Sequence, residues 1–165
     1  MYQKVKNIWQ LKHRDLDYVE RHDYTSATWT DNEDLDRYNG LIGIDHISLS
    51  DEQILEFFYD DPWPNITNKK YAIHRIRPSW IIPEHRDLYL KYRTNHNIDR
   101  VTSITRIVVF LEDWSPGHIL QIENKIITPW RAGDWVSWIG DTPHMAANLG
   151  SADRYTLQIT GINDV

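Results

Sequence analysis

The chain has no cysteine among its 165 residues. This absence excludes a disulfide framework, a thiolate metal site and a cysteine nucleophile. Eight histidines make imidazole the available nitrogen ligand for a transition metal. No apolar run approaches the length of a membrane span, and the first ten residues contain no signal-peptide core. We therefore expect a soluble, intracellular (cytoplasmic) protein with no membrane partner.

Positive charge is also scarce, since 18 Lys and Arg face 24 Asp and Glu and the formal net charge is −6. This balance disfavours broad binding to the phosphate backbone of a nucleic acid, although a local basic patch stays compatible with it. With 41% hydrophobic and 25% charged residues, the chain should fold and not stay disordered. We expect a single domain over residues 1–165. Nothing in the sequence indicates an oligomeric state.

Strand patterns dominate from Lys70 onward. Residues 102–111 contain a β-branched run that predicts a buried central strand. Further short strands with turn signals between them are expected at His118–Ile122, Lys125–Thr128, Trp135–Ile139, Met145–Leu149 and Arg154–Gly161. Short strands at regular spacing indicate a sandwich or a barrel, so we assign residues 70–165 to a β core.

Residues 1–69 are expected to add N-terminal strands, loops and short helices that pack on this core. A strand is predicted at Leu41–Ile47 and a short helix near Asp15–His22. Ser50 followed by Gln53 has the spacing of a capping box, which predicts a helix over about residues 51–59.

The tripeptide His85-Arg86-Asp87 contains two metal-ligand types at a spacing of two. On a strand, such residues face the same side, so both could reach one ion if His144 folds back beside them. Two histidines and one carboxylate suit Fe(II), Mn(II), Co(II) or Zn(II), and they leave coordination positions open for other ligands. A second copy at residues 13–15 lies in a polar segment without strand context, so we do not expect it to bind metal.

The second half of the chain extends this pattern. A strand beginning at Trp135 precedes Pro143-His144, and Arg154-Tyr155-Thr156 opens the last predicted strand. The arrangement resembles the Fe(II)- and 2-oxoglutarate-dependent oxygenase superfamily over roughly residues 70–161. The resemblance implies a mainly β fold, with a double-stranded β-helix (jelly-roll or cupin-like) core and a few short N-terminal helices.

The resemblance also implies roles for individual residues. The catalytic Fe(II) ligands would be His85, Asp87 and His144. The co-substrate 2-oxoglutarate would be bound by Arg154 and Thr156, with Tyr71 as a second hydrogen-bond donor and Asn148 orienting either His144 or the co-substrate. The chemistry is consistent, because a guanidinium offers parallel donors to a carboxylate and a hydroxyl two residues along a strand faces the same way. The remaining iron position would take O2.

A dioxygenase of this type couples oxidative decarboxylation of 2-oxoglutarate to succinate with hydroxylation of a C–H bond. The related halogenases lack the carboxylate ligand, so Asp87 favours hydroxylation. The nucleic-acid-modifying branch usually has another Arg six residues after the co-substrate Arg, where this chain has Thr160. The expected substrate is therefore a small molecule or a protein side chain.

Two alternatives stay open at the level of sequence. One is a cupin-like metalloenzyme that does not use 2-oxoglutarate, in which Arg154 would be incidental. The other is a non-catalytic jelly-roll domain with a binding or structural role, in which the His-Asp-His set would be a coincidence.

Overall fold

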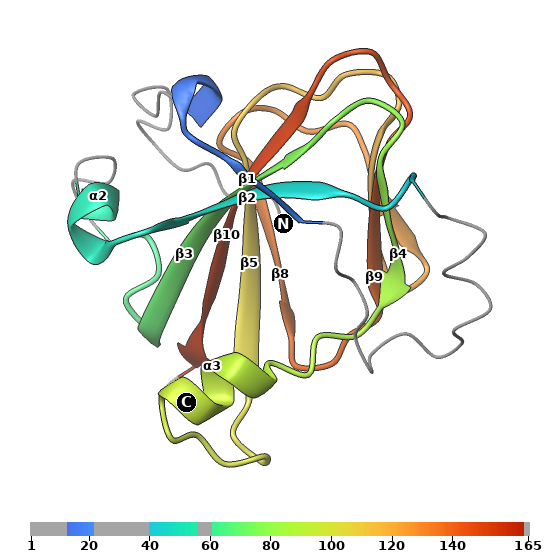
Figure 1. The fold of residues 1–165 in the computed structure, drawn as a ribbon. Coiled ribbons are helices and arrows are strands. Elements are labelled where there is room, and N and C mark those ends of the chain that lie inside the picture. Colours follow the sequence, from blue (N-terminus) through green and yellow to red (C-terminus); the bar gives the residue numbers. More distant parts are fainter. Residues whose placement is uncertain (1–12, 22–39, 56–60, 164–165) are drawn as a thin grey trace.

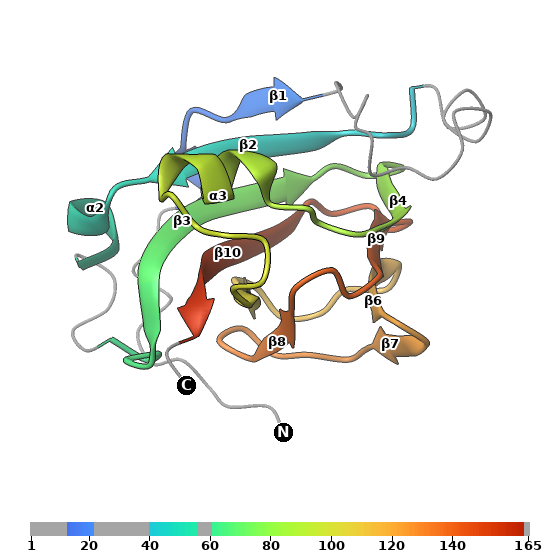
Figure 2. The same ribbon diagram turned by 90° about the horizontal axis from the view of Figure 1, so that it is seen from below.

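Two antiparallel β-sheets face each other in the computed structural model, which describes residues 13–21, 40–55 and 61–163 (Figures 1 and 2). Within this described part, one sheet has the strand order β1-β2-β3-β10-β5-β8 and the other has the order β4-β9-β6-β7. The strands are β1 (Val19–Arg21), β2 (Ile44–Leu49), β3 (Ile66–Ile76), β4 (Ile81–His85), β5 (Ile104–Phe110), β6 (His118–Ile122), β7 (Lys125–Ile127), β8 (Trp135–Ile139), β9 (His144–Asn148) and β10 (Arg154–Asn163). The helices are a 3-10 turn (His13–Asp15), α2 (Asp51–Leu55) and α3 (Leu90–Asn95).

The core is the double-stranded β-helix that the sequence predicted. From β3 onward the chain passes from one sheet to the other at each step, except at the β6–β7 hairpin. Strands β1 and β2 extend the larger sheet beyond β3. The β-branched run forms β5, which lies between β10 and β8 and is almost wholly buried. Burial on both faces explains why its apolar pattern is continuous and does not alternate.

Hydrophobic side chains cover both faces of the larger sheet. On the outer face, Leu49, Ile54 and Trp63 pack with Ile73 and Leu157, so the N-terminal region covers this side. A second cluster of buried side chains fills the space between the sheets, and it includes Ile76, Ile82, Val108, Phe110, Leu120, Trp130, Trp138 and Ala146. The second cluster separates the inner face of the larger sheet from the smaller sheet, and Ile76, Ile82 and Val108 of this cluster also line the cavity that contains the candidate site.

The capping box at the start of α2 is confirmed. The Ser50 amide donates to Gln53 Oε1 (2.8 Å), and the Gln53 amide donates to Ser50 Oγ (3.2 Å). Of the helix predicted over 51–59, residues 51–55 are helical and 56–60 lie outside the described residues. The strand predicted at residues 41–47 occurs at residues 44–49.

The short helix predicted near residues 15–22 is wrong over its described part. Residues 13–15 form a 3-10 turn, and β1 follows it. Val19 to Arg21 pair with His46 to Ile44 at the sheet edge. Pairing with a distant strand overrides the local preference, and no local pattern could have indicated it.

Helix α3 was not predicted. It lies at the end of the larger sheet where β3 and β5 begin and β10 ends (Figure 1). It starts after Tyr89, which has a φ of 54° and makes no side-chain capping bond, so the usual start signal is missing. The Tyr92 hydroxyl donates to the Asn68 carbonyl (2.8 Å) and ties α3 to the start of β3. No helix in the described residues is long and apolar enough to cross a membrane.

Candidate metal centre

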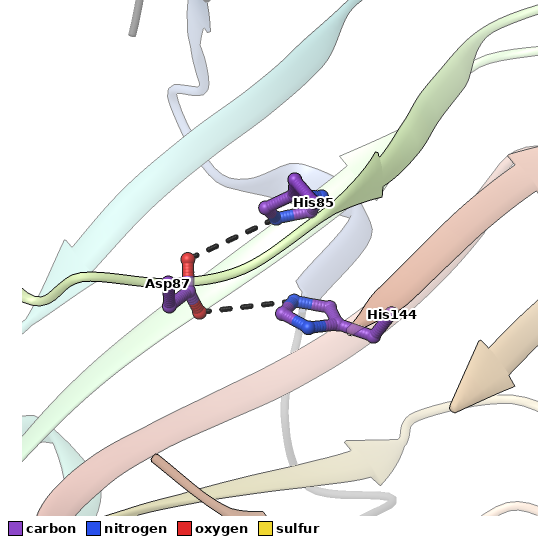
Figure 3. A group of neighbouring side chains, drawn as sticks. All are labelled: His85, Asp87 and His144. Atoms are coloured by element: carbon purple, nitrogen blue, oxygen red, sulfur yellow. Dashed lines mark ion pairs between the residues drawn. The ribbon is translucent and has the colours of Figure 1, made fainter. Parts of the chain in front are cut away.

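His85, Asp87 and His144 converge at one point between the sheets, with Asp87 facing both imidazoles (Figure 3). Asp87 Oδ1 lies 3.8 Å from His85 Nε2, and Asp87 Oδ2 lies 3.7 Å from His144 Nε2. One ligand atom from each residue lies within 4.8 Å of the others. The structure therefore brings together the three residues that the sequence proposed as metal ligands, within reach of one ion.

The strand register explains this convergence. His85 on β4 lies directly opposite His144 on β9. The pairing shifts between Ile82 and His85, as in a β-bulge, so that both side chains line the cavity although they are three residues apart. Asp87 follows two residues after β4 has ended, so the pair does not share one strand as the sequence had suggested.

Backbone carbonyls fix the tautomer of both histidines. His85 Nδ1 lies 2.8 Å from the Pro83 carbonyl, and His144 Nδ1 lies 2.9 Å from the Thr142 carbonyl. Because a carbonyl only accepts, each Nδ1 carries a hydrogen, and Nε2 is the ring nitrogen that faces Asp87. Burial, together with nearby His85, lowers the pKa of His144 to about 4. The imidazole of His144 is thus neutral at pH 7, as a metal ligand must be.

Arg106 is the partner of Asp87. Its Nη2 donates to Asp87 Oδ2 (2.7 Å), and its Nη1 donates to Gln158 Oε1 (3.0 Å). Burial raises the pKa of Asp87, but Arg106 and the two imidazoles outweigh that effect and hold this pKa well below its ordinary value. Asp87 is therefore an anion held in a fixed orientation. The sequence did contain a signal for Arg106, since it is the one charged residue in the apolar run of β5.

Two aromatic residues beside the triad were missed by the sequence analysis. The ring of Trp138 lies 4.7 Å from that of His144, centroid to centroid. The Tyr89 ring lies 5.2 Å from the guanidinium carbon of Arg106, and its hydroxyl is buried. Tyr89 also adopts a left-handed conformation that side chains other than glycine rarely take. Only the fold brings these rings to the site.

Arg154 is a buried cation for which the described residues supply no anionic partner. It is only 4% exposed, and in the described part of the chain its Nε and Nη2 have no hydrogen-bond partner. Burial lowers the pKa of Arg154 to about 10, and its guanidinium carbon lies 5.5 Å from the centroid of the Trp130 ring. An unpaired charge in a protein interior is costly, so this position is suited to a negatively charged ligand.

Arg154 and Thr156 face the same side of β10, where they line the same cavity as the triad. The cavity has a volume of about 630 Å³. Thr156 is 1% exposed and lies beside His74 of β3 and Phe110 of β5. The predicted metal ligands and the predicted carboxylate-binding pair thus share one chamber between the sheets.

The other two sequence candidates have different surroundings. Tyr71 alternates with the residues that line the cavity, and its ring packs with the outer hydrophobic cluster, so it borders the chamber only at the rim. Asn148 is fully buried, and its amide donates to the carbonyls of Ile76 and Ala152 (both 2.8 Å). Its Oδ1 accepts from the Gly150 amide (3.0 Å). Asn148 therefore stabilises the backbone, which corrects the expectation that it orients His144 or a co-substrate.

Two further histidines lie apart from the triad. His13, in the second His-x-Asp copy, places its Nε2 2.8 Å from Glu112 Oε1. His118 is 3% exposed, with its Nε2 2.9 Å from the Ala152 carbonyl. Neither belongs to the group of described side chains that could share an ion.

Comparisons with known proteins agree with the fold. No family model matches the chain, and no curated protein matches it. Among solved structures, a prolyl-4-hydroxylase from Pseudomonas putida is 14% identical with a TM-score of 0.51, over 74% of this chain and 71% of that one. A predicted oxalate decarboxylase from Thermotoga maritima is 12% identical (TM-score 0.43, over 73% and 81%), and a cupin protein from Bacteroides fragilis is 14% identical (TM-score 0.44, over 71% and 75%). At these identities the likeness shows the fold alone, a cupin-like double-stranded β-helix.

Proposed function

We propose that this protein is an Fe(II)- and 2-oxoglutarate-dependent oxygenase that hydroxylates a C–H bond of its substrate. One observation carries the proposal. A His-Asp-His set and a buried arginine that has no counter-ion among the described residues line the same cavity. The first can bind a transition metal, and the second can bind a carboxylate. The cupin-like fold, which a solved prolyl-4-hydroxylase shares, is consistent with this assignment.

The donor set fits a divalent transition metal. His85 and His144 would bind through Nε2, because their Nδ1 atoms donate to backbone carbonyls. Asp87 would bind as an anion while Arg106 holds its Oδ2. Two imidazoles and one carboxylate leave positions for a chelating co-substrate and for O2. Bound there, Fe(II) with 2-oxoglutarate supplies oxidative decarboxylation to succinate and CO2, coupled to hydroxylation.

The co-substrate site would be built by Arg154 and Thr156. A buried guanidinium binds a carboxylate strongly, since it offers parallel donors and water does not screen the pair. The neighbouring Trp130 ring, which also stacks on Phe110 at 4.0 Å, excludes water from one side of this position. The protein's part in the reaction is to orient the co-substrate relative to the metal ligands and to keep the chamber dry.

The alternatives explain less of the structure. A metalloenzyme without 2-oxoglutarate would leave Arg154 buried with no anion to balance it, at a cost in stability. A purely structural domain would need a second reason to gather His85, Asp87 and His144 beside it. The oxygenase requires both features, and it is therefore the function that we propose.

Anaerobic titration with Fe(II) and 2-oxoglutarate tests the proposal. A visible charge-transfer band requires both components on one metal, and we expect it in the wild-type protein. His144→Ala should abolish the band and succinate formation, whereas His96→Ala, a control outside the triad, should keep both. Metal binding without the band would favour the metalloenzyme without 2-oxoglutarate. Failure of folded protein to bind metal would favour the non-catalytic domain.

A further inference from the structure

The cavity side of the larger sheet has cationic residues at both ends. At one end lies Arg154 of β10. Six residues further along β10, Thr160 is in register with Lys70 of β3 on one side and with Arg106 of β5 on the other. All four residues line the cavity. At about 3.3 Å per residue, the two ends are about 20 Å apart along the strand, so one small ligand at Arg154 does not fill both.

Helix α3 brings a further lysine to the Lys70 end. The hydrogen bond from the Tyr92 hydroxyl to the Asn68 carbonyl (2.8 Å) holds the helix against the start of β3. Lys91 precedes Tyr92, and Lys70 follows Asn68 by two residues. Both lysines line the cavity and are exposed at its mouth. Figure 1 shows α3 across this end of the sheet.

The charge of the cavity wall is opposite to that of the protein. Among the described residues, its lining contains four Lys and Arg side chains and a single carboxylate, Asp87, although the whole chain has a net charge of −6. If Fe(II) and 2-oxoglutarate bind as proposed, their charges of 2+ and 2− cancel. A surplus of three positive charges therefore remains, and two of the three belong to Lys70 and Lys91. Such a wall favours an anionic ligand and repels a cationic one.

We propose that the substrate is a small molecule bearing a carboxylate or phosphate group, and that Lys70 and Lys91 bind this group at the mouth of the cavity. The rest of the molecule then extends inwards towards Asp87 and the two histidines. The assignment of substrate rests on the proposed function, whereas the anion site itself does not. A small molecule fits better than a protein side chain, because α3 lies across this end and the cavity measures about 630 Å³.

Binding of matched probes to the full chain tests this anion site. The probes are phenyl phosphate and benzoate, each compared with a neutral counterpart, phenol and benzamide. Saturation-transfer NMR gives the dissociation constants. The Arg154→Met background prevents the probes from binding at Arg154, and no metal is added, so the result does not depend on iron or 2-oxoglutarate. We expect at least one anion to bind about tenfold more tightly than its neutral counterpart, as two exposed ion pairs allow. A preference for phenyl phosphate over phenol indicates a phosphate site, and a preference for benzoate over benzamide indicates a carboxylate site.

Charge reversal locates the site. In Lys70→Glu/Lys91→Glu the preference for the anion should disappear, and in Lys70→Gln/Lys91→Gln it should fall several-fold. The control Arg100→Glu/Lys125→Glu changes the net charge equally at exposed positions outside the cavity lining, and it should keep the preference. Equal preference in all variants, or none in the starting protein, overturns the anion site. If the preference is present but the charge-transfer band is absent from wild-type protein, the proposed function fails and the anion site stands.

Discussion

Replacing Arg154 by methionine should stabilise the ligand-free protein while weakening co-substrate binding. Burial lowers the pKa of this guanidinium from 12.5 to about 10. That difference corresponds to about 3 kcal/mol of unfavourable charge burial. Methionine has a similar length and carries no charge, and imperfect repacking should cost about 1 kcal/mol. The net gain of about 2 kcal/mol predicts a rise in Tm of about 4–8 °C for a chain of this size.

The same substitution removes the proposed partner of the co-substrate carboxylate. Loss of one member of a buried, hydrogen-bonded charge pair costs about 2–5 kcal/mol. The affinity for 2-oxoglutarate should therefore fall by about 30-fold or more. Thermal unfolding followed by circular dichroism measures the first effect. Calorimetric titration of the Mn(II)-loaded protein with 2-oxoglutarate measures the second without turnover.

Arg106→Met is the matched comparison, because this arginine lines the same cavity, is largely enclosed (side chain 16% exposed) and has an anionic partner. Removing it leaves Asp87, whose side chain is 25% exposed, without its ion pair, so stability should fall by about 2–3 kcal/mol. The same Arg-to-Met change should therefore raise the stability of the protein at position 154 and lower it at position 106. A folded Arg154→Met protein that is less stable than wild type, or that binds 2-oxoglutarate equally well, would refute the reasoning.

Four further substitutions test the surrounding structure. Burial raises the pKa of Glu112, but hydrogen bonds from His13 and Arg14 outweigh this effect and lower the pKa from 4.5 to about 2. The stability that the Glu112 carboxylate gives the folded protein is therefore complete above about pH 4.5 and is lost as the pH falls towards 2. In denaturant unfolding at pH 5 and pH 2, wild type should lose about 2 kcal/mol more than Glu112→Gln, because the other carboxylates titrate in both proteins. Asn148→Ala leaves two carbonyls without their donor and should cost about 2–4 kcal/mol, with Mn(II) affinity unchanged in the folded protein. Gly117→Ala should cost at least about 2 kcal/mol, since φ is +93° and a Cβ would lie 2.3 Å from the Gly150 amide nitrogen. Gly140 has a φ of +61° and no atom within 4 Å of an added Cβ, so Gly140→Ala should cost only about 1 kcal/mol of stability. Equal costs at the two glycines would contradict a role for the close backbone contact at Gly117.

Local sequence patterns predicted the features that depend on neighbouring residues. The apolar run of residues 102–111 and the short strands after it predicted the β core, because strand period and turn residues are local properties. The capping box formed at Ser50 and Gln53 because its two hydrogen bonds span only three residues. Helix α3 and strand β1 were not predicted, since the contacts that hold them come from strands distant in the sequence.

By itself, the sequence determined the chemistry that is available: His85, Asp87 and His144 as donors, and Arg154 with Thr156 on one face of a strand. Only the tertiary structure decided which charges are paired. Arg106 and Arg154 look alike in the sequence, yet in the part of the chain that the structure describes Arg106 pairs with a carboxylate and Arg154 pairs with none. The reason is that ion pairing and burial depend on distances between strands far apart along the chain, and local periodicity carries no information about those distances.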